Sequence, residues 1–181
     1  MEENVPRWDG WSSKPVGVAK RSRVGSTPSL FRHFSAERMA RERFLGSIPD
    51  DRLYDPEFDM WVQVAGSDFL IGASSFGLFL AGEIIAFTSK PKGAEVSLGR
   101  GMATVESAKT VLAVHAPISF VLLQGNDVLE ERPSTINQDP YVAGWMGRVQ
   151  ATAWELEQAR LVPAQAYRDH IRRLDARAQF L

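Results

Sequence analysis

Lys109 is the side chain whose position in the sequence most suggests chemistry. A largely apolar run, residues 102–105, precedes it and a second, residues 111–114, follows it, with Glu106 and Ser107 between them. Apolar and β-branched residues on both sides of a short polar segment predict two strands joined by a turn, with Lys109 at the tip. A neutral lysine amine can form a stable amide there, on a long stem. Most turn lysines are only solvated, so the pattern alone does not distinguish a modified lysine from an ordinary one.

The rest of the sequence offers little for catalysis. It contains no cysteine, which excludes disulfides, thiolate metal sites and cysteine nucleophiles. His33, His115 and His170 are far apart and lack metal-ligand spacing, and we expect a structural role for His115. The segment Gly99-Arg100-Gly101 is too short for a dinucleotide fingerprint and precedes a strand. With no nucleophile beside a base, we expect a protein that is not itself an enzyme.

A second motif further along the chain makes the interpretation of Lys109 more specific. The sequence has Val105-Glu106-Ser107-Ala108-Lys109, then Ala116-Pro117, then Asn137-Gln138-Asp139-Pro140-Tyr141-Val142-Ala143-Gly144-Trp145. In this order and spacing the chain resembles the glycine cleavage system H protein family. The resemblance extends roughly from Tyr54 to Tyr167 and includes Tyr54-Asp55-Pro56-Glu57 before Trp61.

The resemblance implies that Lys109 carries lipoate in amide linkage and that Glu106 presents the hairpin to the lipoate-attaching enzyme. It implies an aminomethyl group as cargo, with glycine dehydrogenase, aminomethyltransferase and dihydrolipoamide dehydrogenase as partners. Asn137 and Asp139 are predicted partner contacts, although turn chemistry alone accounts for these residue types. The neighbours of Lys109 favour lipoate over biotin, because biotin carriers typically have methionine on both sides of the lysine.

Two other functions stay open. The segment from Lys90 to Ser107 is also similar to lipoate-binding carriers of the heterodisulfide-reductase-like sulfur-oxidation pathway, which would carry sulfur intermediates on the same lysine. The other alternative is a carrier fold without lipoate that serves as a binding or regulatory module. It is motivated by the basic head of the chain and by Phe120, which replaces a glycine of the family that affects lipoate attachment. Phenylalanine does not readily adopt a positive φ, so we expect an altered turn or inefficient modification there.

Composition and charge indicate a single domain with an extension. The chain has 181 residues and a net charge of -1, which give no case for nucleic acid, and no apolar run is long enough to span a membrane. We expect a basic N-terminal extension over residues 1–50, partly disordered with a helix near residues 29–45. Residues 51–181 then form an H-protein-like lipoyl-carrier domain. Acidic residues among the first ten argue against a transit peptide, so we expect a cytoplasmic protein, with the mitochondrial matrix as the alternative.

The body reads as short strands followed by helices. Strands are predicted at residues 60–64, 69–73, 83–88, 102–105, 111–114, 118–123 and 145–149, with a helix or loop at 74–81 and a polar loop at 130–135. A capping box at Thr152 and Glu155 predicts a helix to about Leu161. A final helix after Pro163 should bury one face, comprising Ala164, Tyr167, Ile171, Leu174 and Ala178. We therefore predict a mainly β fold, a barrel-sandwich hybrid with C-terminal helices.

Overall fold

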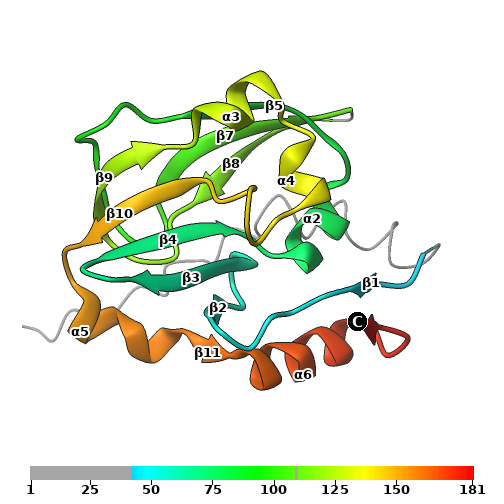
Figure 1. Ribbon diagram of the computed structural model, residues 1–181. Coiled ribbons are helices and arrows are strands. Elements are labelled where there is room, and N and C mark those ends of the chain that lie inside the picture. Colours follow the sequence, from blue (N-terminus) through cyan, green and yellow to red (C-terminus); the bar gives the residue numbers. More distant parts are fainter. Residues whose placement is uncertain (1–41, 109) are drawn as a thin grey trace, which may run out of the picture.

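The structure is a computed structural model that describes residues 42–108 and 110–181, and within them two antiparallel sheets face each other (Figure 1). In sheet order, the larger sheet consists of β11 (Val162–Pro163), β2 (Leu53–Asp55), β3 (Met60–Ala65), β4 (Asp68–Ala73), β10 (Gly147–Ala151), β9 (Phe120–Gly125) and β6 (Glu95–Val96). The smaller sheet consists of β5 (Ile84–Ser89), β7 (Gly101–Ser107) and β8 (Val111–His115). The predictions for residues 1–41 and for Lys109 lie outside the described residues.

Aliphatic side chains fill the space between the two sheets. Along β7 and β8 the side chains alternate: Val105, Leu112 and Val114 are buried, whereas Thr104 and Ala113 are exposed. Alternation is what a strand with one buried face requires. Val149 of the larger sheet and Phe87 of β5 belong to the same core. The predicted barrel-sandwich hybrid is confirmed.

A second core, rich in aromatic residues, lies on the other side of the larger sheet. It packs β2 and β3 against α2 (Ser75–Ala81), α6 (Ala164–Leu174) and the segment before β1 (Leu45–Gly46). Its buried members are Phe44, Ile48, Tyr54, Trp61, Phe76, Leu80, Ala164, Tyr167 and Ile171. The helix α6 thus packs together with the start of the described chain against the larger sheet.

The predicted helix near residues 29–45 is wrong over its described end. Phe44 is buried, and its backbone N–H donates to the Asp175 carboxylate at 2.9 Å while its carbonyl accepts from the Gln179 N–H at 2.8 Å. β1 then runs parallel to β12 (Gln179–Phe180). The chain is extended there because its backbone groups are paired with the C-terminal segment.

Several helix predictions need correction. The capping box is wrong: α5 (Trp154–Glu157) has Ala153 as its N-cap, because the Thr152 N–H donates to the Ser119 carbonyl at 2.9 Å and continues the strand geometry. A 3₁₀ turn, η1 (Gln158–Arg160), confirms the predicted end near Leu161. In α6 the face prediction fails at Leu174, which is 45% exposed, and at Ala178, which lies beyond the helix end.

The polar segment at residues 130–135 is a loop only over residues 132–134. It contains the end of α3 (Asp127–Glu131) and the first residue of α4 (Thr135–Gln138). Leu129 and Ile136 are fully buried in the aliphatic core, so two apolar side chains anchor these short helices within a polar sequence. The strand predicted at 145–149 begins at Gly147 and is not the last, because β11 and β12 follow it.

The predicted β3–β4 hairpin and the helix at residues 74–81 are confirmed, whereas the strand predicted at 118–123 begins only at Phe120, as β9. β3 and β4 form a hairpin around Gly66 and Ser67, and Gly66 has a positive φ of 70°. Residues 75–81 form α2, whose N-cap Ser74 accepts a hydrogen bond from the Gly77 N–H at 3.0 Å. Among the described helices, none is long and apolar enough to cross a membrane.

Candidate functional site

The β7–β8 hairpin ends in a two-residue connection. The Ser107 N–H donates to the Thr110 carbonyl at 2.8 Å, and the Thr110 N–H donates back to the Ser107 carbonyl at 3.3 Å. Reciprocal bonds of this kind close a tight hairpin, so only Ala108 and Lys109 stand beyond the last ladder pair. Ala108 is exposed. The expected tight hairpin is therefore present, although Lys109 itself is not among the described residues.

The outward face of the three-stranded sheet carries Glu106 among uncharged residues. Glu106 pairs through its backbone with Val111 of β8 and Ala86 of β5, and Thr104 pairs with Ala113 one step further from the tip. Glu106 is exposed, and Val111 is 57% exposed. A partner that meets the tip would thus find one carboxylate in a surface of small or apolar side chains.

His115 lies at the opposite end of β8 from the tip. Its ring stacks on Phe58 with 5.3 Å between ring centroids, and burial lowers the pKa of His115 below its usual value. The half-buried ring packs between the hairpin base and the segment before β3. The structural role predicted for this residue agrees with its position.

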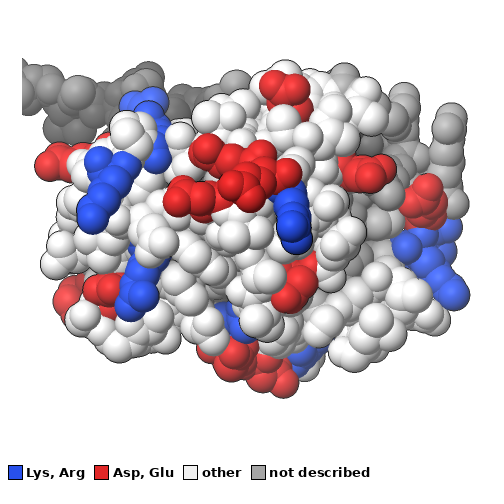
Figure 2. All heavy atoms as spheres, turned by 45° about the horizontal axis from the view of Figure 1, so that its top comes forward, with Lys and Arg blue, Asp and Glu red and all other residues white. Residues whose placement is uncertain are grey.

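An acidic surface borders the edge of the three-stranded sheet. Red side chains gather over α3 in Figure 2, and the acidic residues of this helix are Asp127, Glu130 and Glu131. The Glu130 carboxylate accepts a hydrogen bond from the Ser89 N–H, at the end of β5, at 3.3 Å. Negative charge beside the hairpin would attract a positively charged partner surface and repel a negative one.

Asn137 supports the strand next to the hairpin. Its side-chain oxygen accepts from the Ile84 N–H at 2.8 Å, and its amide nitrogen donates to the Gly82 carbonyl at 2.9 Å. Ile84 pairs with Ser107, two residues before Lys109. Asn137 thus fixes the start of β5 close to the tip, and its contact with a partner protein stays a prediction.

Asp139 organises the turn that follows α4. Its carboxylate accepts hydrogen bonds from the N–H groups of Val142 at 3.1 Å and Ala143 at 2.9 Å. Gly144 closes the turn, and a Cβ at this position would lie 2.6 Å from the Asp139 carbonyl oxygen. A side chain would therefore force the turn open. The geometry of the turn accounts for both Asp139 and Gly144, and contact of Asp139 with a partner protein stays a prediction.

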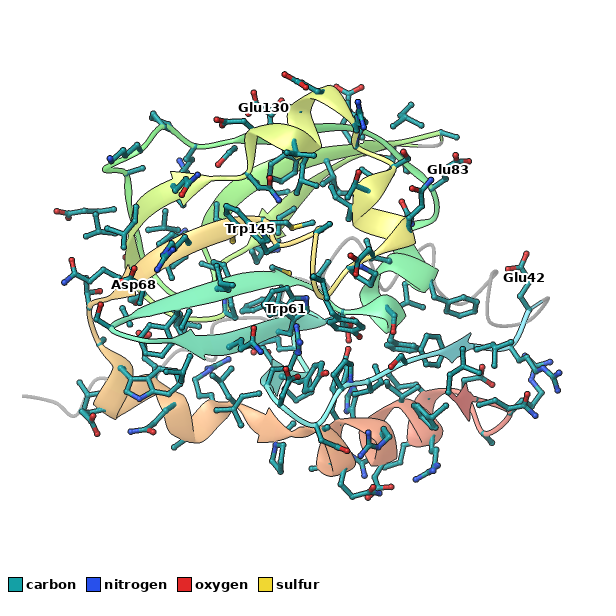
Figure 3. The ribbon with its side chains drawn as sticks, in the orientation of Figure 1. Glu42, Trp61, Asp68, Glu83, Glu130 and Trp145 are labelled. Atoms are coloured by element: carbon teal, nitrogen blue, oxygen red, sulfur yellow. The ribbon has the colours of Figure 1, made fainter. Side chains whose placement is uncertain are left out.

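Two separate motifs of the resembling region meet at Trp61, which lies within the larger sheet (Figure 3). Its indole N–H donates to the Pro140 carbonyl at 3.1 Å, across 79 residues of sequence. The Arg52 guanidinium lies 4.7 Å from the Trp61 ring centroid and 4.9 Å from that of Tyr141. Gly72 is required beneath the indole, where a Cβ would lie 2.6 Å from the ring.

The role of Arg52 was not predicted from the sequence. Besides stacking on two aromatic rings, it donates a hydrogen bond to the Tyr141 carbonyl at 3.1 Å and pairs with Asp51 at 2.8 Å. Arg52 immediately precedes β2, and nothing in the neighbouring sequence indicates that a basic residue there is buried. Only the three-dimensional meeting of Trp61 and Tyr141 explains why this cation is 7% exposed.

The expectation that Phe120 alters a turn is wrong. Phe120 is 1% exposed, opens β9 and pairs with Val96 and Ala151. Among the described non-glycine residues only Asp59 has a positive φ, so the backbone at position 120 suits phenylalanine. Ser119 precedes it and is held by Glu157, which accepts from the Ser119 N–H at 2.6 Å and from its hydroxyl at 2.7 Å. Phe120 follows the base of the hairpin, at the other end of β8 from Lys109.

The hairpin fits a covalently attached arm. The backbone groups of Ser107 and Thr110 are satisfied, and the described side chains on either side of Lys109 are small or exposed. A lysine in such a connection can reach an attaching enzyme, and acylation of its amine would leave the ladder bonds intact. The described residues next to Lys109 are thus compatible with lipoate on this lysine.

Comparison with known proteins points to one family. The model of the Glycine cleavage H-protein family matches residues 52–173. A glycine cleavage system H protein of Beutenbergia cavernae is 36% identical over 114 residues, which cover 62% of this chain and 91% of that protein. A mitochondrial one of Oryza sativa subsp. indica is 31% identical over 166 residues, covering 92% of this chain and 96% of that protein. The crystal structure of a glycine cleavage system H protein from Mycobacterium marinum is similar with a TM-score of 0.60 at 31% identity, covering 67% and 97% of the two chains.

Proposed function

Because the chain belongs to the glycine cleavage H-protein family, we propose that it is a lipoyl carrier, with lipoate in amide linkage on Lys109 and an aminomethyl group as its cargo. The observation that carries the proposal is the closed β7–β8 hairpin, in which Ser107 and Thr110, the residues on either side of Ala108 and Lys109 in the sequence motif, exchange two backbone hydrogen bonds. The family is one of carriers rather than catalysts. Catalysis therefore belongs to the partner enzymes.

The residues of this chain hold and present the lysine. The lipoyl group, when attached, would supply the dithiolane chemistry that takes up and releases the cargo. The paired strands orient the arm, and Glu106 offers a charged contact to the lipoate-attaching enzyme from the exposed face of the hairpin. The small side chains around Glu106 leave room for the enzyme to approach.

The proposed partners follow from the same function. They are glycine dehydrogenase, which would load the arm, aminomethyltransferase, which would unload it, and dihydrolipoamide dehydrogenase, which would reoxidise it. We place the protein in the cytoplasm with these enzymes, or in the mitochondrial matrix, as for the relative from rice. The turn of Asn137 and Asp139 is a further proposed partner contact, because Val142 within it is 76% exposed.

Mass spectrometry of the protein from its native cells tests the proposal. We expect a lipoyl increment on the intact protein and on the peptide that spans Lys109. The Lys109→Arg variant expressed in the same cells should lack the increment and keep the same unfolding transition. An unmodified Lys109, in cells that lipoylate their other carriers, would contradict the proposal and leave the binding module as the explanation.

A second measurement separates the two lipoyl pathways. The lipoylated chain should be reduced in the presence of glycine and the decarboxylating glycine dehydrogenase of the same cells. The names of the relatives support this outcome. Lipoylation without any glycine-dependent reduction would instead favour the sulfur-oxidation carrier.

A further inference from the structure

A groove of about 610 Å³ opens on the same side of the molecule as the hairpin tip. β1, α2, α4 and the C-terminal residue border it (Figure 1). Its lining residues include Leu45, Phe79, Glu83, Gln138, Tyr141 and Leu181. A volume of this size is within the range of sites that hold a ligand or several side chains.

The groove exposes apolar surface to water. Leu45 is 55% exposed and Leu181 is 83% exposed, although both are large hydrophobic residues. The partly buried ring of Phe79, whose centroid lies 5.8 Å from that of Phe44, joins them in the lining. Contiguous exposed apolar surface usually marks a place where another segment or molecule binds.

The chain itself enters at the edge of this groove. The described residues begin at Glu42, Phe44 is buried, and Leu45 lines the groove. The twelve residues before Glu42 therefore start next to the groove and can reach across it, since an extended chain spans about 3.3–3.6 Å per residue. Four of them are large and apolar: Leu30, Phe31, Phe34 and Met39. A tether this short gives them an effective concentration in the millimolar range at the groove.

Charge also favours the chain's own N-terminal segment as the occupant of the groove. Residues 1–41 contain eight Lys/Arg and four Asp/Glu, a net charge of +4, whereas residues 42–181 contain thirteen and eighteen, a net charge of -5. The exposed side chain of Glu83 belongs to the groove lining, on the same side of the body as Glu42 (Figure 3). Opposite net charges on the tether and the body favour the closed arrangement over a detached one.

We propose that the apolar side chains of residues 30–39 occupy this groove in the same molecule. The segment then lies beside the hairpin, because Glu83 in the lining is followed by Ile84, which pairs with Ser107. The docked segment would form part of the surface that an enzyme meets when it reaches for Lys109. That consequence rests on the proposed function, whereas the docking itself does not.

Paramagnetic labelling of the full-length chain tests the docking. The chain has no cysteine, so Gln138→Cys places one nitroxide in the groove, and Ser67→Cys places a control label in the β3–β4 turn, which lies at the other end of β3 from the groove side. We expect the amide signals of residues 30–39 to be lost with the label at position 138 and retained with the label at position 67. The readout needs no lipoate, so a failed docking is distinguishable from a failed carrier function.

Matched variants separate docking from mere tethering. Phe31→Ser/Phe34→Ser keeps the tether length and should restore the signals. Leu181→Glu in the groove should also restore them, whereas Leu156→Glu, on a residue that is 85% exposed in α5, should not. Signal loss that persists in Phe31→Ser/Phe34→Ser would overturn the proposal. Signal loss caused by a labelled second molecule would also overturn it, because a second copy would then be the occupant. A native protein whose mass begins after residue 39 would overturn it as well.

Discussion

In the aromatic core between the larger sheet, α2 and α6, side chains donate hydrogen bonds to segments that are far away in the sequence. The β7–β8 hairpin, by contrast, is held by backbone bonds between strands and by apolar packing. The Trp61 indole N–H donates to the Pro140 carbonyl, the Tyr141 hydroxyl donates to the Ser47 carbonyl at 2.8 Å, and the Tyr167 hydroxyl donates to the Asp59 carboxylate at 2.7 Å. Directional bonds specify one arrangement of the chain. Apolar contacts on the inner face of the hairpin leave its outer face open to partners.

The same contrast appears in the titratable groups. Burial raises the pKa of Tyr167, and the negative charge of Asp59 raises it further, so the hydroxyl stays protonated and donates. At the hairpin, Glu106 is exposed. The aromatic core therefore holds buried polar groups in specific bonds, whereas the hairpin exposes a carboxylate to water.

The largest expected effect is that of Trp61→Ala. The indole is 0% exposed and joins the larger sheet to Pro140 and Arg52, so its removal should cost about 3–5 kcal/mol of unfolding free energy, mostly from the cavity. Urea denaturation measures the loss. Val64→Ala on the same strand, where the side chain is 63% exposed, should change stability by no more than about 0.5 kcal/mol. Equal losses for the two variants would contradict the contrast.

Tyr167→Phe sharpens the comparison by removing a single oxygen. The ring stack on Tyr54, with 4.7 Å between centroids, would remain, but the Asp59 carboxylate would lose the bond from the Tyr167 hydroxyl at 2.7 Å, and the Ser74 hydroxyl would lose one partner at 2.8 Å. We expect a loss of about 1–3 kcal/mol, the cost of removing these buried hydrogen bonds. A double-mutant cycle with Ser74→Ala should be non-additive, and simple additivity would argue against a shared network.

His115→Gln tests the base of the hairpin through pH. Because the folded-state pKa of His115 is lowered, the unfolded chain binds a proton first, and stability should fall as the pH drops below about 6.5. The loss continues until the pH passes the folded-state pKa. Chemical denaturation at neutral and mildly acidic pH should show a smaller loss on acidification for the variant. An unchanged pH dependence would mean that burial of His115 costs nothing.

The smallest effect on stability belongs to Glu106→Gln. The side chain is exposed, so the unfolding free energy should change by no more than about 0.5 kcal/mol. The initial rate of enzymatic lipoylation should fall about tenfold, the effect of losing one charged hydrogen bond to the attaching enzyme. Glu155→Gln, an exposed carboxylate in α5, is the control and should leave the rate unchanged. A full lipoylation rate in Glu106→Gln would remove its proposed role.

Local patterns predicted the elements that local bonds stabilise. The β3–β4 hairpin, α2 with its Ser74 cap and the tight β7–β8 hairpin all followed from residue alternation and turn chemistry. In the site, the motifs located the turn of Asp139, whereas Lys109 lies outside the described residues. The structure explains that turn through the carboxylate bonds to Val142 and Ala143.

The elements that were not predicted depend on contacts between residues far apart in the sequence. The Thr152 cap failed because its N–H bonds the Ser119 carbonyl, and Phe120 fits because the backbone there is an ordinary strand. The parallel pair of β1 and β12 joins residues more than one hundred positions apart, which no window of sequence reports. The helices α3 and α4 are specified by the burial of Leu129 and Ile136 rather than by helical periodicity.

The position of β7 between β5 and β8 has a mechanical consequence for a swinging arm. A pull on the tip acts along β7, and its bonds to β5, which extend from Ser107 opposite Ile84 to Ala103 opposite Ser89, lie across the direction of force. They are loaded together in shear rather than opened one after another. The hairpin is thus built to bear tension along β7, the direction in which an enzyme would pull the proposed arm.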